Sequence, residues 1–145
     1  MNSREEILHL INNYTFLIDS GDLDGFASLF EHGEWGAEGS QLLSGKQQML
    51  DMLNSIIIIY PDGTPRTRHV VSNVDIHVDE DNDVATSQSY ITLLQQTDDF
   101  PLQVILSGTY CDDFERVDGQ WRFARRIIKQ PFFGDISAHN KQAQH

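Results

Sequence analysis

Histidine side chains give this sequence its clearest capacity for acid–base chemistry. The ordinary pKa of histidine lies near physiological pH, so the ring both takes up and releases protons in neutral solution. His69 stands near the start of TRHVVSNVDI, residues 67–76, a stretch whose pattern predicts a β-strand. The position has two interpretations. His69 is either a base at the mouth of a pocket or a surface residue where a strand begins.

A histidine base works best with a carboxylate behind it, because the carboxylate fixes the tautomer and stabilises the imidazolium that forms. Asp19 and Asp22, near the end of a predicted first helix, are carboxylates that could approach His69. Spacing alone does not show a contact with either. Isolated histidines and aspartates are common, so these residues alone favour a helix-ending Asp19 and an exposed His69 over a catalytic pair.

The sequence supports a metal site or a catalytic nucleophile less well than it supports acid–base chemistry. The histidines are His9, His32, His69, His77, His139 and His145. No pair has the i, i+4 spacing of a helical zinc motif, and no local set joins two histidines to a carboxylate, so we expect no metal site. There is no Gly-x-Ser-x-Gly elbow or phosphate-binding glycine loop. We expect Cys111, in GTYCDDF, to be a packing residue, and we expect no cofactor.

Composition bounds the class of protein. The net charge of −12, from 22 acidic and 10 basic side chains, argues against nucleic acid as a partner, because phosphate backbones require a basic face. The longest apolar run, residues 56–60, is far shorter than the ~20 residues that span a bilayer. The start MNSREEILHL lacks the features of a signal peptide, and there is a single cysteine. We therefore expect a cytoplasmic location and no membrane contact.

The first part of the chain predicts helices. Ser3 and Glu6 have capping-box spacing ahead of an apolar stripe, and Gly21 in DSGD suits the end of that helix. Asp22 can cap a short second helix. A short strand is expected around Trp35, and a third helix is expected to begin near Ser44, which has the same spacing to Gln47.

From residue 66 the pattern changes to alternation. It predicts strands at about 67–79, 84–96, 102–117 and 120–130, the last two joined by a hairpin at Asp118-Gly119. This order predicts an α+β fold with helices packed on one face of a curved antiparallel sheet. Apolar residues on both strand faces suggest a second subunit on the other side. We expect one domain over residues 1–135 and a polar tail over 136–145 that frays.

Three blocks together carry a family resemblance: YTFLIDSGDLDGFASLFEHGEW, PRTRHVVSNVDI and SGTYCDDFERVDGQWRFARRII. In order and spacing, from about residue 6 to 128, the chain resembles the SnoaL-like branch of the nuclear transport factor 2-like superfamily. The resemblance implies a cone-shaped α+β barrel, with three N-terminal helices closing over a strongly curved antiparallel sheet and a deep pocket inside. It also implies a homodimer or homotrimer formed through the outer face of the sheet. It is less specific for activity, because one fold hosts many functions.

Two enzyme groups of the superfamily, scytalone dehydratase and hexachlorocyclohexane dehydrochlorinase, are similar in a more specific way. Both place an aspartate at the end of the first helix and a histidine at the start of the strand after the third helix. Together these residues remove a proton during an elimination. Asp19 in LIDSGD and His69 in TRHVVSN stand at the matching positions, so the resemblance implies a catalytic pair.

The resemblance is incomplete in the later strands. Scytalone dehydratase also uses a second histidine, whereas TSQSYITLL here offers Ser87, Ser89 and Tyr90 but no histidine. Dehydration of the same substrate is therefore not implied. We expect four further residues to line a substrate pocket, each of which also suits a plain packing role: Tyr14, Trp35, Asn73 and Tyr90.

The function expected from these observations is that of a small cofactor-free lyase or isomerase. His69 would abstract a proton from an apolar, cyclic carbonyl or hydroxylated compound, and Asp19 would orient it. The blocks RTRHVVSNV and DGQWRFARR also resemble the β subunits of aromatic-ring-hydroxylating dioxygenases, which are non-catalytic partners of an iron–sulfur α subunit. The chain is short for that family. A small-molecule-binding module without chemistry is a third alternative.

Overall fold

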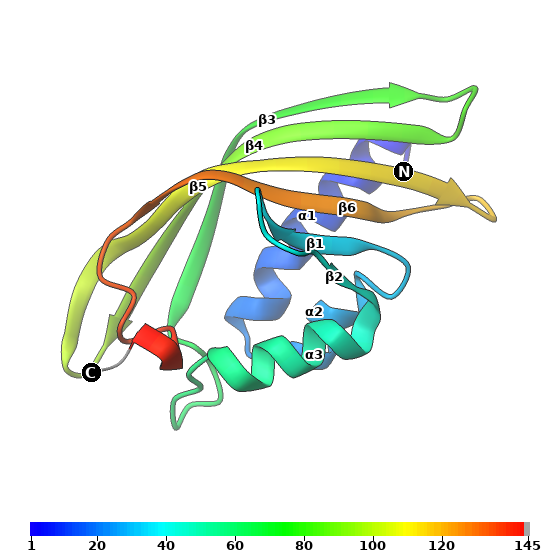
Figure 1. The fold of residues 1–145 in the computed structure, drawn as a ribbon. Helices are drawn as coiled ribbons and strands as arrows, with labels where there is room; N and C mark the ends of the chain where they lie inside the picture. The colour runs from blue at the N-terminus through cyan, green and yellow to red at the C-terminus, as the bar shows by residue number, and fades with distance from the viewer. Residues whose placement is uncertain (144–145) are drawn as a thin grey trace.

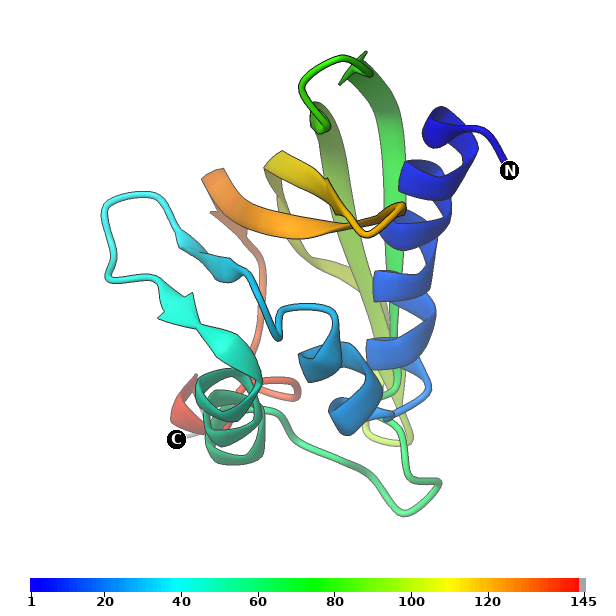
Figure 2. The same ribbon diagram turned by 90° about the vertical axis from the view of Figure 1, so that its right-hand side faces the viewer.

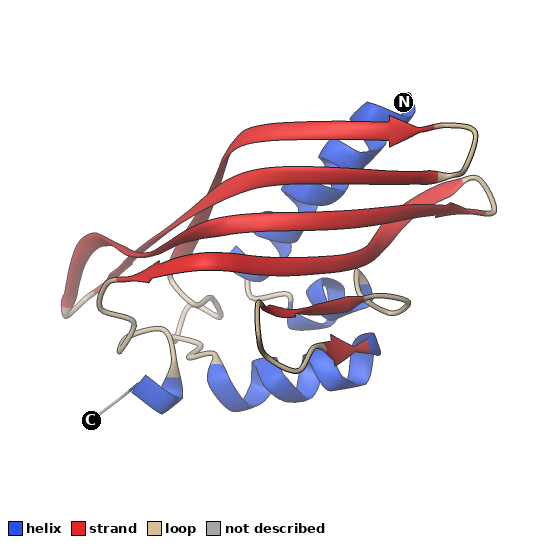
Figure 3. Ribbon diagram, turned by 45° about the horizontal axis from the view of Figure 1, so that its top comes forward, coloured by secondary structure: helices blue, strands red, loops and turns tan. Residues whose placement is uncertain are grey.

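The computed structural model describes residues 1–143, and its largest element is a bent six-stranded sheet that arches over the helices (Figure 1). Its strand order is β2-β1-β6-β5-β4-β3. The strands are β1 Glu34–Ala37, β2 Leu43–Ser44, β3 Thr67–Asp79, β4 Val84–Thr97, β5 Phe100–Val117 and β6 Gln120–Phe133. The four long strands lie side by side and bend together (Figure 3). Four of these strands and the short β1 were predicted; the two-residue β2 was not.

The sheet departs from the predicted antiparallel barrel in two respects. β1 pairs with β6 in parallel, from Glu34 opposite Arg125 to Ala37 opposite Ile128, while the remaining pairs are antiparallel. The sheet is therefore mixed, and it is open between β2 and β3. The α+β cone with three helices on a curved sheet is confirmed, whereas the wholly antiparallel pairing is wrong.

Three helices fill the concave side of the sheet: α1 Ser3–Asp19, α2 Leu23–Ser28 and α3 Gly45–Ile56. Figure 2 shows α1 running along β3. The cap of α1 is Asn2, whose side chain accepts from Glu5 N, so the predicted Ser3 cap is wrong by one residue. Asp22 caps α2 as predicted, accepting from Gly25 N at 2.8 Å. None of the described helices is both long and apolar enough to cross a membrane.

The turn after α1 requires a glycine at position 21 for two separate reasons. Its φ of +82° lies in the left-handed region that side chains disfavour. A Cβ at this position would lie 2.0 Å from the carbonyl oxygen of Gly63, so the turn packs directly on the loop before β3. This packing holds the end of α1 against the start of β3.

The core lies between the helices and the inner face of the sheet. In β4 the buried residues alternate strictly, with Ala85, Ile91 and Leu93 facing inward. In β3 the inward set changes phase, because a bulge between Ser72 and Asp75 places Asn73 in the left-handed region at φ 56°. The strand thereby keeps its apolar residues inward on both sides of the bulge.

Residues 136–143 pack on the domain and do not fray. The Ala138 carbonyl accepts hydrogen bonds from the Gln95 amide at 3.0 Å and from the Tyr60 hydroxyl. Ile58 N donates to the His139 carbonyl at 3.0 Å, and the short 3-10 helix η1 Lys141–Ala143 follows. The prediction of a fraying tail is therefore wrong for this segment, and residues 144–145 lie outside the described residues.

Candidate functional site

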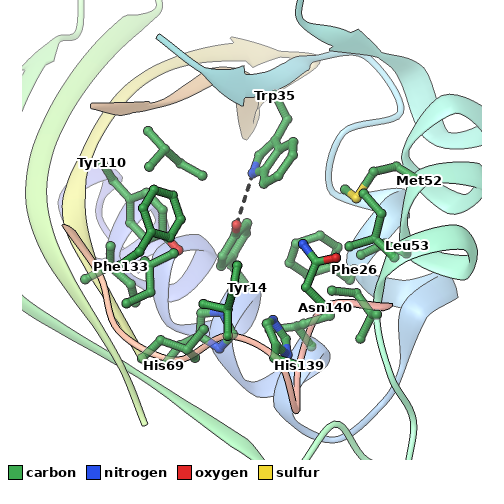
Figure 4. Close-up of a pocket in the computed structure, with 18 residues that line it drawn as sticks. Tyr14, Phe26, Trp35, Met52, Leu53, His69, Tyr110, Phe133, His139 and Asn140 are labelled. Atoms are coloured by element: carbon green, nitrogen blue, oxygen red, sulfur yellow. Dashed lines mark hydrogen bonds between the residues drawn. The ribbon is translucent and has the colours of Figure 1, made fainter. Parts of the chain in front are cut away.

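A cavity of about 280 Å³ lies between the concave face of the sheet, the helices and the C-terminal segment. Its walls are mostly apolar and aromatic, and they come from α1, α2, β1, α3, the four long strands and the segment after β6 (Figure 4). Four of the lining side chains carry a polar nitrogen: Trp35, His69, His139 and Asn140. A cavity of this character suits an apolar small molecule held by a few polar contacts.

Asp19 and His69 are in direct contact at the edge of this cavity. The His69 Nδ1 lies 2.6 Å from Asp19 Oδ1, and the side chains of His69 and Asp19 are only 10% and 17% exposed. The carboxylate also accepts from the Thr67 hydroxyl at 2.8 Å and from the backbone N–H of His69 at 2.8 Å. Three donors from the start of β3 thus hold the last residue of α1 in one orientation.

This geometry fixes the tautomer of His69. An ionised carboxylate only accepts hydrogen bonds, so the Nδ1 beside Asp19 carries the proton of the neutral ring. The other nitrogen, Nε2, then holds a lone pair, and no described residue hydrogen-bonds to it. Because the ring lines the cavity, that lone pair is available to a ligand as a base.

The local sequence explains why both side chains point inward. Before the bulge, Thr67 and His69 share the inward phase of β3, so both reach toward the end of α1. Gly21 ends α1 two residues after Asp19 and turns the chain onto the β3 loop. The contact therefore depends on the phase of one strand and on the close turn after one helix.

Tyr14 and Trp35 both line the cavity. The Trp35 indole donates to the Tyr14 hydroxyl at 3.0 Å, as the dashed line in Figure 4 shows. Tyr110, which the sequence analysis did not select, lies beside Tyr14, and burial raises its pKa well above the ordinary value. Its hydroxyl therefore stays protonated in neutral solution.

Asn73 and Tyr90 do not line this cavity, so the prediction that they line a substrate pocket is wrong. Asn73 is the bulge residue of β3 and is exposed. Tyr90 alternates with the inward-facing Ser89 and Ile91, so it points outward and is 51% exposed. Both lie instead on a shallow depression of the outer surface.

Tyr14 and Tyr110 form an aromatic wall of the cavity, and a buried ion pair lies behind it. Arg126 Nε and Nη2 donate to the two carboxylate oxygens of Asp112, at 2.7 and 2.9 Å, and both side chains are fully buried. The guanidinium carbon lies 3.7 Å from the centre of the Tyr110 ring and 4.3 Å from that of Tyr14. Burial acts to lower the pKa of Arg126, but Asp112 outweighs it and raises the pKa overall. The aromatic wall therefore packs against a fixed positive charge.

His139 is a further site residue that the sequence analysis missed. It lines the cavity from the C-terminal segment, and its pKa is lowered to about 4, first by burial and then by the positive charge that His69 carries when it is protonated. Its sequence context, SAHNKQAQH, is polar and gives no sign of burial. Among residues 1–143, no group of three histidine, cysteine or acidic side chains is arranged to hold a metal ion.

Comparisons with known proteins agree with this fold. A family model described as a SnoaL-like domain matches residues 1–127. No curated protein matches the sequence. A single-residue variant of Rv3472, a protein of unknown function from Mycobacterium tuberculosis, is 26% identical, with a TM-score of 0.72 over 86% of this chain and 69% of that one.

Two solved structures from Novosphingobium aromaticivorans share the fold. One is an NTF2-like protein with a cystatin-like fold, 21% identical, with a TM-score of 0.72 over 98% of this chain and 88% of that one. The other is a candidate scytalone dehydratase, 22% identical, with a TM-score of 0.69 over 94% of this chain and 91% of that one. At these identities the likeness concerns the fold alone.

Proposed function

Since this chain belongs to the SnoaL-like domain family, we propose that its cavity is the site of a cofactor-free lyase or isomerase. In this proposal His69 removes a proton from an apolar, cyclic small molecule. The observation that carries the proposal is the contact between Asp19 and His69, which leaves the Nε2 lone pair free inside an apolar cavity.

Proton transfer follows directly from this arrangement. His69 Nε2 takes a proton from a substrate carbon, and the ring becomes an imidazolium. The Asp19 carboxylate, 2.6 Å from Nδ1, stabilises the new positive charge. Both side chains are largely buried, so this attraction is stronger than it is in solution. Loss of a leaving group then completes an elimination, and return of the proton to another carbon completes an isomerisation.

The walls also select the substrate. Phe26, Leu53 and Ile91 present apolar surface. Few polar groups line the cavity, so a strongly charged substrate would lose its hydration without compensation. A compact ring compound with one activating polar group fits this lining.

The exchange of α-protons for deuterium on cyclic ketones tests the proposal, with 2-tetralone, 2-indanone and cyclohexanone as probes in D₂O followed by ¹H NMR. The wild type should accelerate exchange of at least one of them. His69→Ala should lower that acceleration about 100- to 10,000-fold, the usual contribution of a general base.

The chain contains a matched control. His77 and Asp75 lie on the same strand, with His77 Nε2 3.1 Å from Asp75 Oδ2, but their side chains are 74% and 71% exposed. His77→Ala should leave exchange unchanged. If the wild type exchanges no ketone faster than His69→Ala does, the proposal fails.

A purely ligand-binding module and a dioxygenase β-type subunit are the alternatives. The first would raise the unfolding temperature with a ketone without accelerating its exchange. The second would co-purify with an iron–sulfur α subunit, whether or not His69 is changed. The catalytic proposal is preferred because neither alternative requires a base whose tautomer is fixed by a carboxylate.

A further inference from the structure

His139 lies at the same end of the cavity as His69, with Trp35 at the other end (Figure 4). The two histidines are close enough for a protonated His69 to lower the pKa of His139, whereas the charge of Asp19 raises it. These three groups form one cluster, although His139 lies 70 residues after His69 in the chain.

The backbone around His139 is held in place. Its N–H donates to the Ile136 carbonyl at 3.0 Å, and its own carbonyl accepts from Ile58 N at 3.0 Å. The preceding carbonyl, that of Ala138, is held by Gln95 and Tyr60. The ring is therefore presented to the cavity by a fixed segment.

The ring of His139 is uncharged in neutral solution, because burial and the neighbouring His69 both hold its pKa near 4. A neutral imidazole carries a proton on only one nitrogen. Nδ1 is enclosed, and it has no hydrogen-bond partner among residues 1–143. An enclosed N–H without an acceptor is rarer and more costly than an enclosed lone pair. The favoured tautomer therefore places the proton on Nε2, the ring nitrogen left open to a ligand.

We propose that His139 donates a hydrogen bond from Nε2–H to a carbonyl oxygen of the substrate, which makes the substrate a carbonyl compound with an acidic C–H next to that carbonyl. This inference rests on the proposed function and narrows it. His69 offers an acceptor and His139 offers a donor, so one substrate can meet both through its C–H and its oxygen.

The reaction step balances without another reactant. The proton of the α-carbon passes to His69 Nε2, and the electrons of the C–H bond form a carbon–carbon double bond. The electrons of the C=O π bond move to the oxygen, which becomes an enolate. His139 keeps its own proton and holds the enolate oxygen through the hydrogen bond, in the way that an oxyanion is stabilised at a preorganised donor.

The test compares 2-tetralone with tetralin, the same ring system without the carbonyl. A ketone oxygen only accepts hydrogen bonds, so its affinity reports a donor and not the lone pair of His69. His139→Leu should weaken binding of 2-tetralone about threefold to tenfold, the usual loss for one neutral hydrogen bond. Binding of tetralin should not change, and His139→Gln, which retains an N–H donor, should preserve much of the ketone affinity.

The carbonyl stretch of bound 2-tetralone gives a readout that a merely structural role would not move. In the wild type and in His139→Gln it should lie at a lower frequency than in His139→Leu. If it is the same in all three, His139 is not the donor. A shift that survives His139→Leu and disappears in Asn140→Leu would assign the donor to Asn140 and overturn the inference.

A measurement on the wild type covers the case in which the leucine variant does not fold. In ¹⁵N-histidine NMR spectra the His139 signal should show a protonated Nε2 and an unprotonated Nδ1; the reverse tautomer would overturn the inference. Equal carbonyl frequencies in the wild type and His139→Leu, with His69-dependent exchange intact, would refute only the role of His139. Absence of His69-dependent exchange in the wild type would refute the proposed function and this inference together.

Discussion

Asp19 occupies a position where a carboxylate is electrostatically disfavoured. It is the last residue of α1, and the C-terminal end of a helix carries partial negative charge. The Thr67 hydroxyl, the His69 ring and the His69 backbone N–H offset this with three hydrogen bonds of 2.6–2.8 Å. A residue placed only to end a helix would not need three donors, so the arrangement favours a role that requires a fixed negative charge beside the ring.

His139 makes stability depend on pH in a defined window. Its pKa is lowered from 6.5 to about 4, first by burial. Between these values the unfolded chain binds a proton that the native state does not, so the free energy of unfolding falls as the pH falls from 6.5 toward 4. Over this pH range, His139 alone should lower the free energy of unfolding by about 3 kcal/mol.

Urea denaturation between pH 7 and 4.5 measures this effect. His139→Leu should show a shallower fall in the free energy of unfolding than the wild type, and His77→Ala, which changes an exposed ring, should show the wild-type fall. Identical slopes in His139→Leu and the wild type would contradict the buried, neutral state of His139.

At the scale of elements, the long strands could be predicted because alternation and the Asp118-Gly119 turn are local signals. The bulge at Asn73 was not predicted, although His69 and Val71 are out of phase with Val74 and Ile76 in the sequence. The parallel pairing of β1 with β6 could not be predicted, since the partner strand begins about 80 residues later. The docking of His139 could not be predicted either, because a polar segment is buried here only through contacts supplied by distant residues.

The turn after α1 should be the most sensitive backbone position near the site. Gly21→Ala meets the Gly63 carbonyl in addition to the cost of a left-handed backbone, so it should lower the free energy of unfolding by more than about 1 kcal/mol. Gly63→Ala is the matched control, with a similar φ of +85° but open space around its Cβ. Equal losses in thermal or urea denaturation would mean that the contact with Gly63 is unimportant.

The pairing of β5 with β6 depends on a buried charge pair. Arg126→Met would leave Asp112 buried without its cation, which should lower the free energy of unfolding by about 3–5 kcal/mol. Arg122, on the same strand, forms a 2.7 Å ion pair with Glu115, and the two side chains are each 34% exposed. Arg122→Met should therefore lower the free energy of unfolding by less than about 1 kcal/mol. Similar losses in urea denaturation would contradict this account.

At the scale of the whole molecule, the outer face of the sheet takes no part in the cavity, and apolar side chains are exposed on it. Val70 and Tyr90, on neighbouring strands, are 45% and 51% exposed there. The homodimer or homotrimer expected through this face stays a prediction, and it would give the exposed ring of Tyr90 a surface to pack against. Sedimentation equilibrium should then find an oligomer that Tyr90→Glu dissociates. A wild-type monomer at micromolar concentration would contradict the expectation.

The overall arrangement brings four distant parts of the chain to one small volume: the end of α1, the start of β3, the aromatic wall and the C-terminal segment. The central claim is that the His69 ring acts there as the base. Imidazole added to His69→Ala tests it most directly, since a free ring can occupy the vacated space. We predict that imidazole restores exchange of 2-tetralone well beyond its effect on the ketone in buffer; an effect no larger than in buffer, or undiminished exchange by His69→Ala without imidazole, would contradict the claim.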